Sequence, residues 1–225
     1  MIFGIMAAVL LLLLLFKFIA RKLQWTKLER RMKNLHKPVG MMILVVSLVH
    51  LLVTLKVWDT RAAAVVATGI ATVVMLFLMA AGYTYRKKLD KLWMKTHRYG
   101  AIITLVLLVC HIATYNIDFA QYQKNIAAIK IHGMDAALLQ DASYEGEYDA
   151  GYIYAKVRVT VKEGRIDDIT ILQHDNERGK PAEAILQEII VQQQTNVDAV
   201  SGATNSSLVL KKAVEQALQQ YRRQD

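Results

Sequence analysis

Four long runs of apolar residues occupy the first 117 positions, and they constrain the fold more than any other feature of the chain. Each run contains almost no charge and is close to the ~20 residues that a helix needs to cross a bilayer. The runs are residues 1–19, 38–58, 62–85 and 99–117. Together with a 54% hydrophobic composition, they predict an all-α bundle of four transmembrane helices, with a modest soluble part after it.

Basic residues crowd beside these runs, in residues 17–37 and 86–98. By the positive-inside rule both segments are predicted to be cytoplasmic loops, so the second and fourth spans run outward in parallel. The net charge of +9 is therefore interpreted as a topology signal, and no nucleic-acid partner is expected. Positive charge follows the first run instead of preceding it, which favours an uncleaved helix over a signal peptide. The single cysteine, Cys110, leaves no cysteine-based metal site.

Two histidines recur at one interval in the second and fourth spans. His36 and His50 are 14 positions apart (50 − 36), and so are His97 and His111 (111 − 97). At about 1.5 Å and 100° per residue, this interval places both histidines of a helix on nearly one face, about 21 Å apart. The pattern predicts two b-type haems. His36 and His97 would bind the inner iron, and His50 and His111 the outer iron.

An intramembrane histidine can instead relay protons or form a hydrogen bond to a neighbouring helix. A relay has no reason to repeat one interval on two helices, so the repetition favours iron ligation. Gly40 and Gly100 follow the inner histidines, and the missing side chains there would let a flat macrocycle approach the backbone. Pro38 disfavours helix at Lys37, which makes the inner pair the less regular one.

The pattern changes after the fourth span. Residues 118–142 show no clear period and are interpreted as a connector, in which His132 is an ordinary surface histidine. Residues 153–161 then alternate apolar and polar side chains, as a half-buried strand does, and a hairpin turn at 162–165 leads to a second strand. Helices are expected from Pro181 and from near Ser206. Residues 143–225 are therefore predicted to form a small α+β domain, placed outside the cytoplasm by the topology.

A turn of small residues leads into the last helix. It reads Asp198-Ala-Val-Ser-Gly-Ala-Thr204. Gly202 allows the backbone to come close to a ligand, and the free amides of the following helix favour an anion such as phosphate. Alternatively, Ser201 or Thr204 simply caps the helix. The residues alone do not separate these two interpretations.

This turn belongs to a wider resemblance. Residues 143–218 resemble the FMN-binding domain that occurs in sodium-translocating NADH:quinone reductase and in the related electron-transport complex. The matching segments are 143–148, 157–166 and 198–204. The resemblance implies that Thr204 carries FMN through a phosphoester bond made by a flavin transferase, and that Asp198, Ser201, Gly202 and Ala203 belong to the FMN site. His174 and Glu177 either border the flavin or are simply exposed.

The membrane part is similar, more loosely, to the ferric-reductase-like and cytochrome b class of di-haem bundles. With the topology above, this predicts a flavocytochrome of the inner (cytoplasmic) membrane with a periplasmic C-terminal domain. It would take electrons from a quinol or another membrane donor and pass them through two haems to FMN. The expected activity is that of an oxidoreductase that reduces an extracytoplasmic acceptor, most plausibly ferric iron. The alternative is a non-enzymatic cytochrome/flavin subunit that relays electrons to a partner reductase.

Overall fold

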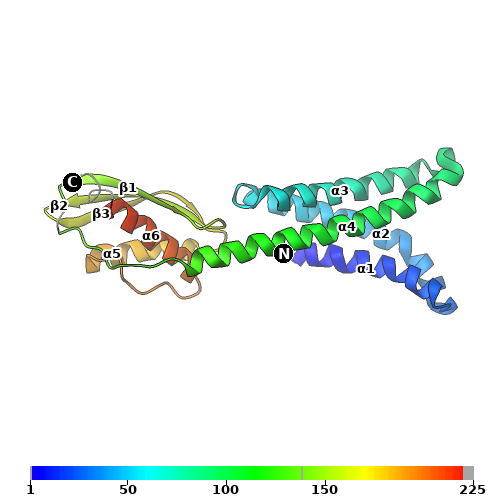
Figure 1. The fold of residues 1–225 in the computed structure, drawn as a ribbon, viewed down its shortest axis with the longest axis horizontal. Coiled ribbons are helices and arrows are strands. Elements are labelled where there is room, and N and C mark those ends of the chain that lie inside the picture. Colours follow the sequence, from blue (N-terminus) through cyan, green and yellow to red (C-terminus); the bar gives the residue numbers. More distant parts are fainter. Residues whose placement is uncertain (1, 138, 220–225) are drawn as a thin grey trace. The chain divides into compact units, whose positions relative to one another are not determined.

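The chain consists of a helical N-terminal region followed by a small three-stranded sheet domain (Figure 1). The structure is a computed structural model that describes residues 2–137 and 139–219. It divides into two compact units, Met1–Ile117 and Asp118–Asp225. Each unit is described by itself.

Four long helices correspond to the four apolar runs. They are α1 (Ile2–Lys22), α2 (Thr26–Thr54), α3 (Ala63–Thr84) and α4 (Arg86–Ala127), with a short 3-10 helix, η1 (Leu55–Thr60), between α2 and α3. All four are long and apolar enough to cross a membrane. Helix α1 packs on α2, and α2 packs on α3.

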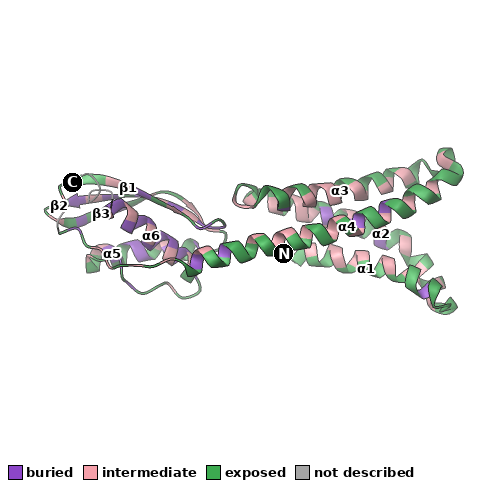
Figure 2. Cartoon of the chain, viewed as in Figure 1, coloured by how far each residue is buried: buried purple, intermediate pink, exposed green. Residues whose placement is uncertain are grey.

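Most residues of α1–α4 are exposed or only partly buried, as the green and pink of these helices in Figure 2 show, and many of the exposed ones are large and apolar. Ile2 is 72% exposed, Phe18 68% and Ile102 59%. Soluble monomers rarely expose apolar surface on this scale. The four helices are therefore compatible with a multi-pass membrane protein.

The basic segments differ from the sequence prediction because they are largely helical. Helix α2 already begins at Thr26, and α4 begins at Arg86 and is interrupted only at Asp90, where φ is +43°. Lysine, arginine and leucine are good helix formers, so these segments extend the apolar helices. Pro38 also lies inside α2, where it removes one backbone hydrogen bond without ending the helix.

The second unit contains an antiparallel sheet in the order β1-β2-β3. Its strands are β1 (Ala142–Asp149), β2 (Tyr154–Lys162) and β3 (Arg165–Asp175). The predicted hairpin between β2 and β3 is confirmed. Its two-residue turn has positive φ at both Glu163 (50°) and Gly164 (69°), as a type I′ turn requires. The sequence pattern does not predict β1 as a strand, since glutamate and glycine are poor strand formers.

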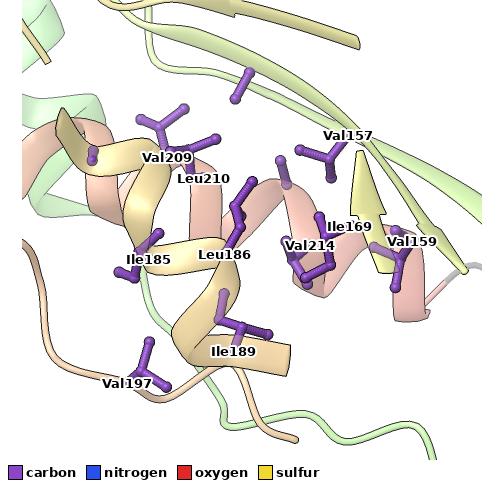
Figure 3. Packing of buried hydrophobic residues seen from close by; sticks show 14 of the residues in the cluster. Val157, Val159, Ile169, Ile185, Leu186, Ile189, Val197, Val209, Leu210 and Val214 are labelled. Atoms are coloured by element: carbon purple, nitrogen blue, oxygen red, sulfur yellow. The ribbon is translucent and has the colours of Figure 1, made fainter. Parts of the chain in front are cut away.

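The core of this unit lies between the sheet and two helices, α5 (Ile185–Gln192) and α6 (Thr204–Gln219). A 3-10 turn, η2 (Lys180–Ala184), leads into α5 with proline at its start. Figure 3 shows the side chains of α5 and α6 meeting those of β2 and β3. Ala155, Val157, Val159 and Val161 of β2 are buried, and each fully buried valine contributes roughly 1.5–3 kcal/mol.

Helix α6 makes close contacts with two other segments of this unit, β1 and residues 132–133. At Gly146 of β1, an added Cβ would collide with the backbone of Ala213 and Ala217 in α6. The side chain of Glu215 in α6 is fully buried and accepts hydrogen bonds from the backbone amides of His132 and Gly133.

The segment before β1 is thus part of the fold. Helix α4 extends to Ala127, ten residues into the range predicted as a connector, and residues 132–133 are bound to Glu215. The His132 side chain is 59% exposed, as expected of a surface histidine, but its Nδ1 lies 3.5 Å from a Glu215 carboxylate oxygen.

Candidate functional site

The turn before α6 presents Thr204 at the surface. Asp198, Ser201, Gly202 and Thr204 are exposed, whereas Ala203 is buried. Gly202 has φ +78°, and an added Cβ there would meet nothing within 4 Å. The structure therefore brings all five predicted FMN-site residues into one turn, with open space beside Gly202.

Side chains from α6 hold this turn in place. The Ser207 hydroxyl accepts a hydrogen bond from the Val200 amide (3.1 Å) and donates one to the Ala203 carbonyl (3.0 Å). The Lys211 ammonium is buried and donates to the Val197 carbonyl at 2.8 Å. Burial lowers the pKa of Lys211, while the carboxylates of Asp198 and Glu215 act in the opposite direction. The bonds from Ser207 and Lys211 leave Ser201 and Thr204 exposed on the outer side of the turn.

Two further segments lie against the start of α6. The Asn205 side-chain amide donates to the Tyr122 hydroxyl at 2.9 Å, and Tyr122 stacks on Tyr152 with 4.7 Å between ring centroids. On another side, Gly179 lies so close to Ser206 that an added Cβ would overlap its hydroxyl. These contacts fix the first turn of α6 relative to the loop that follows β3.

His174, near the end of β3, is not an exposed residue. Its side chain is 2% exposed, and Nδ1 lies 3.0 Å from Glu183 Oε1. Its Nε2 is buried without a hydrogen-bond partner among the described residues. Glu177 is exposed. Of the two residues suggested to border the flavin, only Glu177 is at the surface.

In the N-terminal unit, the structure brings His36 and His97 together. Their ring centroids are 5.8 Å apart with an angle of 79° between the planes. Trp93 packs on His97 at 4.9 Å. The Nδ1 atoms of both histidines are buried and have no partner in the part of the chain that the structure describes. The repeated spacing alone predicts this pair, and Pro38 does not prevent the approach.

The outer histidines lie against glycines of other helices. An added Cβ at Gly4 of α1 would come within 3.1 Å of the His50 ring, and one at Gly69 of α3 within 2.9 Å of the His111 ring. Gly4 and Gly69 thus give the two imidazoles room to lie close against α1 and α3.

The hydrogen bonds of His111 define its tautomer. Nδ1 lies 3.1 Å from the Val65 carbonyl oxygen and 3.3 Å from the Thr68 hydroxyl. A carbonyl oxygen can only accept, so Nδ1 carries the proton and Nε2 of the neutral ring carries the lone pair. This is the state in which an imidazole can bind a metal.

The glycines that were expected to admit a macrocycle differ from each other. Gly40 has nothing within 4 Å of an added Cβ, whereas Gly100 packs against Met75 and Met79.

Among the described residues, no group of three or more His, Cys, Asp or Glu side chains could hold a metal ion. Paired imidazoles fit a porphyrin-bound iron, which needs only axial ligands from the protein.

Several residues at these sites could not be identified from the sequence. Lys211 was unexpected because lysine in an amphipathic helix is usually solvated. Thr68 and Val65 carry no motif, although the glycine at position 69 interrupts an apolar helix and is a signal of close packing. Tyr122 lies in a segment without a clear period.

Comparison with known proteins gives a similarity for the C-terminal part of the chain. Residues 151–219 match the FMN-binding domain family. An uncharacterized protein of Treponema pallidum (strain Nichols) is 33% identical over 87 residues, which cover 37% of this chain and 24% of that protein. The chain thus spans about a quarter of the length of this relative. No solved structure is significantly similar to the chain.

This match supports FMN as the cofactor of the C-terminal part of the chain. It suggests a redox flavoprotein that takes part in flavin-based electron transfer.

Proposed function

We propose that this protein is a transmembrane flavocytochrome. In this proposal, two haems held by His36 with His97 and by His50 with His111 pass electrons outward to FMN bound covalently at Thr204. The flavin then reduces an extracytoplasmic acceptor, for which ferric iron is the best candidate. The protein positions the cofactors and tunes their potentials, while the cofactors supply the redox chemistry.

The exposed Thr204 is the single observation that carries the proposal. The FMN-binding family match covers this residue, and the open face of Gly202 leaves space for a phosphate beside it. The free amides of the first turn of α6 favour a negatively charged group there. An exposed cofactor that faces an open compartment would be lost by dilution unless it were attached, which favours a phosphoester bond.

The haem part of the proposal is supported by the paired histidines. With metal–nitrogen bonds of about 2 Å, an iron between two axial imidazoles separates the ring centroids by roughly 6 Å. The 5.8 Å between His36 and His97 agrees with that separation. The proton on Nδ1 of His111 favours ligation over a proton relay, because its Val65 bond leaves Nε2 as the ligand atom.

The membrane setting rests on the four apolar helices. We place the basic segments in the cytoplasm and the FMN-binding domain in the periplasm, by the positive-inside rule. The electron donor is then a quinol or a membrane protein, and a flavin transferase outside the cytoplasm attaches the FMN. A metal chelate is a suitable acceptor because it needs only access to an exposed flavin edge.

Substitution of Thr204 tests this function. Thr204→Ala should abolish in-gel flavin fluorescence, and the added mass of FMN less one water should disappear from the intact protein. Both haem absorption bands should remain, because the histidines lie in the other compact unit, and ferric reduction should collapse. Thr170→Ala is the control, since it removes an exposed threonine hydroxyl from β3, outside the turn, and should keep the flavin.

Two results would count against the proposal. Ferric reduction by Thr204→Ala at the wild-type rate would make the haems, not the flavin, the exit for electrons. Flavin-loaded protein that reduces ferric chelates only with an added partner would instead favour the non-enzymatic relay subunit.

A further inference from the structure

The environment of His111 differs from that of the inner histidines, and this difference has a redox consequence. The His111 Nδ1 faces the Val65 carbonyl and the Thr68 hydroxyl. The Nδ1 atoms of His36 and His97 are buried without partners among the described residues. In the outer pair, His111 therefore has two hydrogen-bond acceptors beside Nδ1, the ring nitrogen that would not bind the iron.

Gly69 creates this shell. In an α-helix the amide of Gly69 bonds to the carbonyl four residues before it, which is that of Val65. A side chain at position 69 would come within 2.9 Å of His111 Cε1. Without that side chain, the imidazole can reach the second lone pair of the Val65 carbonyl.

Thr68 is oriented to accept a hydrogen bond from His111. Its hydroxyl lies 2.7 Å from the Ala64 carbonyl and 3.1 Å from the Val65 carbonyl of the preceding turn, so its single proton is directed at the backbone of its own helix. The Thr114 hydroxyl, 3.3 Å from that of Thr68, has its own acceptor in the His111 carbonyl at 3.0 Å. The lone pairs of Thr68 are therefore available for the Nδ1 proton of His111.

We propose that Thr68 and the Val65 carbonyl are positioning groups that fix the tautomer of His111 and lower the reduction potential of the outer haem. Acceptors on the Nδ1 proton make the imidazole more basic, and a more basic axial ligand stabilises ferric over ferrous iron. This inference rests on the proposed function, since it requires that His111 binds haem.

Redox titration of the purified full chain, followed by haem absorbance, tests this role. Thr68→Val should keep two haems and shift one of them toward easier reduction. We expect about a fivefold change in its reduction equilibrium, the effect of one neutral hydrogen bond. Thr68→Ser restores the acceptor and should titrate like the wild type.

Thr72→Val is the matched control. Thr72 lies one turn further along α3, and its hydroxyl donates to the Thr68 carbonyl at 2.8 Å, an ordinary bond within the helix. The titration of Thr72→Val should therefore match that of the wild type. The component shifted in Thr68→Val should be the one that His111→Ala removes.

The outcomes separate the two levels of the proposal. If Thr68→Val and Thr72→Val titrate alike, or if the shift falls on the haem that survives in His111→Ala, the role of Thr68 is refuted while haem binding stands. If Thr68→Val loses a haem, the titration of Thr68→Ser decides. An outer haem in Thr68→Ser that is easier to reduce than in the wild type would show that the hydroxyl is not the acceptor. Wild-type protein without haem would overturn the haem proposal itself.

Discussion

Glu215→Gln should strongly destabilise the C-terminal domain, because it changes a buried carboxylate that binds several other groups. The buried carboxylate of Glu215 accepts from the amides of His132 and Gly133 and from the Thr195 hydroxyl (3.0 Å), and it pairs with the Lys212 ammonium at 3.0 Å. Glutamine keeps the shape and one acceptor oxygen, but it turns an NH₂ group toward the ammonium and removes the negative charge.

The magnitude follows from these contacts. A hydrogen bond to a charged group contributes about 1.5–3 kcal/mol to stability, and one between neutral groups contributes about 1 kcal/mol. Neutralising the side chain should therefore weaken each of the three bonds that it accepts by roughly 1 kcal/mol. The lost pairing with Lys212 adds to this. The sum, about 3–5 kcal/mol, agrees with the cost of removing one partner of a buried ion pair, and it is a large part of the stability of a small domain.

Urea unfolding of a fragment of residues 118–225 would measure this loss, with Glu188→Gln as the control. Glu188 is exposed on α5, so its substitution removes the same charge without breaking a buried network. A loss below about 1 kcal/mol for Glu215→Gln, or an equal loss for both variants, would refute the reasoning.

The pH dependence gives a second readout. Burial raises the pKa of Glu215, but the His132 amide, the Lys212 ammonium and the Thr195 hydroxyl outweigh it, so the pKa lies below the ordinary value of 4.5. The stability that Glu215 contributes is therefore present above about pH 4.5 and is lost as the pH falls through the lower folded-state pKa. Glu215→Gln should lack this part of the acid slope, and an identical slope in both proteins would contradict the assignment.

Two further predictions concern the packing and the topology. Gly146→Ala should destabilise the same fragment by about 3 kcal/mol in urea unfolding, because its Cβ would meet backbone atoms of α6. The control Ser143→Ala, in the same strand, should cost less than about 1 kcal/mol. Equal losses in the two variants would contradict the close contact at Gly146. With the exposed Cys110 replaced by alanine, Gln123→Cys should react with an impermeant thiol reagent on intact cells, and Lys91→Cys only after lysis. The reverse labelling pattern would place the FMN-binding domain in the cytoplasm.

The sequence predicts those parts of the fold that depend on periodic burial. The apolar runs correspond to α1–α4, and the alternation from residue 153 corresponds to β2, because a single chemical property repeated along the chain is sufficient in both cases. The prediction failed where pairing overrides local preference. Strand β1 contains Gly146 and two glutamates, and it forms because it pairs with β2 and packs closely on α6.

The sites show the same division. His36 and His97 could be paired from the sequence, because the interval from each to the next histidine of its helix is the same. Glu215 and Lys211 could not be recognised, since a charged residue within a helical pattern is usually solvated. Glu215 is bound by the backbone of residues 132–133, which are 82–83 positions away, and Lys211 by the carbonyl of Val197, 14 positions away. These groups come close only in the folded domain.

The turn that presents Thr204 is held by residues that are synthesised after it. Ser207 and Lys211 supply its side-chain hydrogen bonds, and both belong to α6. Because the ribosome makes the chain from its N-terminus, residues 197–203 cannot take their final form until α6 has been made and has packed on the sheet. An enzyme that recognises the shape of this turn would therefore modify only chains in which α6 is in place, and chains cut short before Lys211 would stay unmodified.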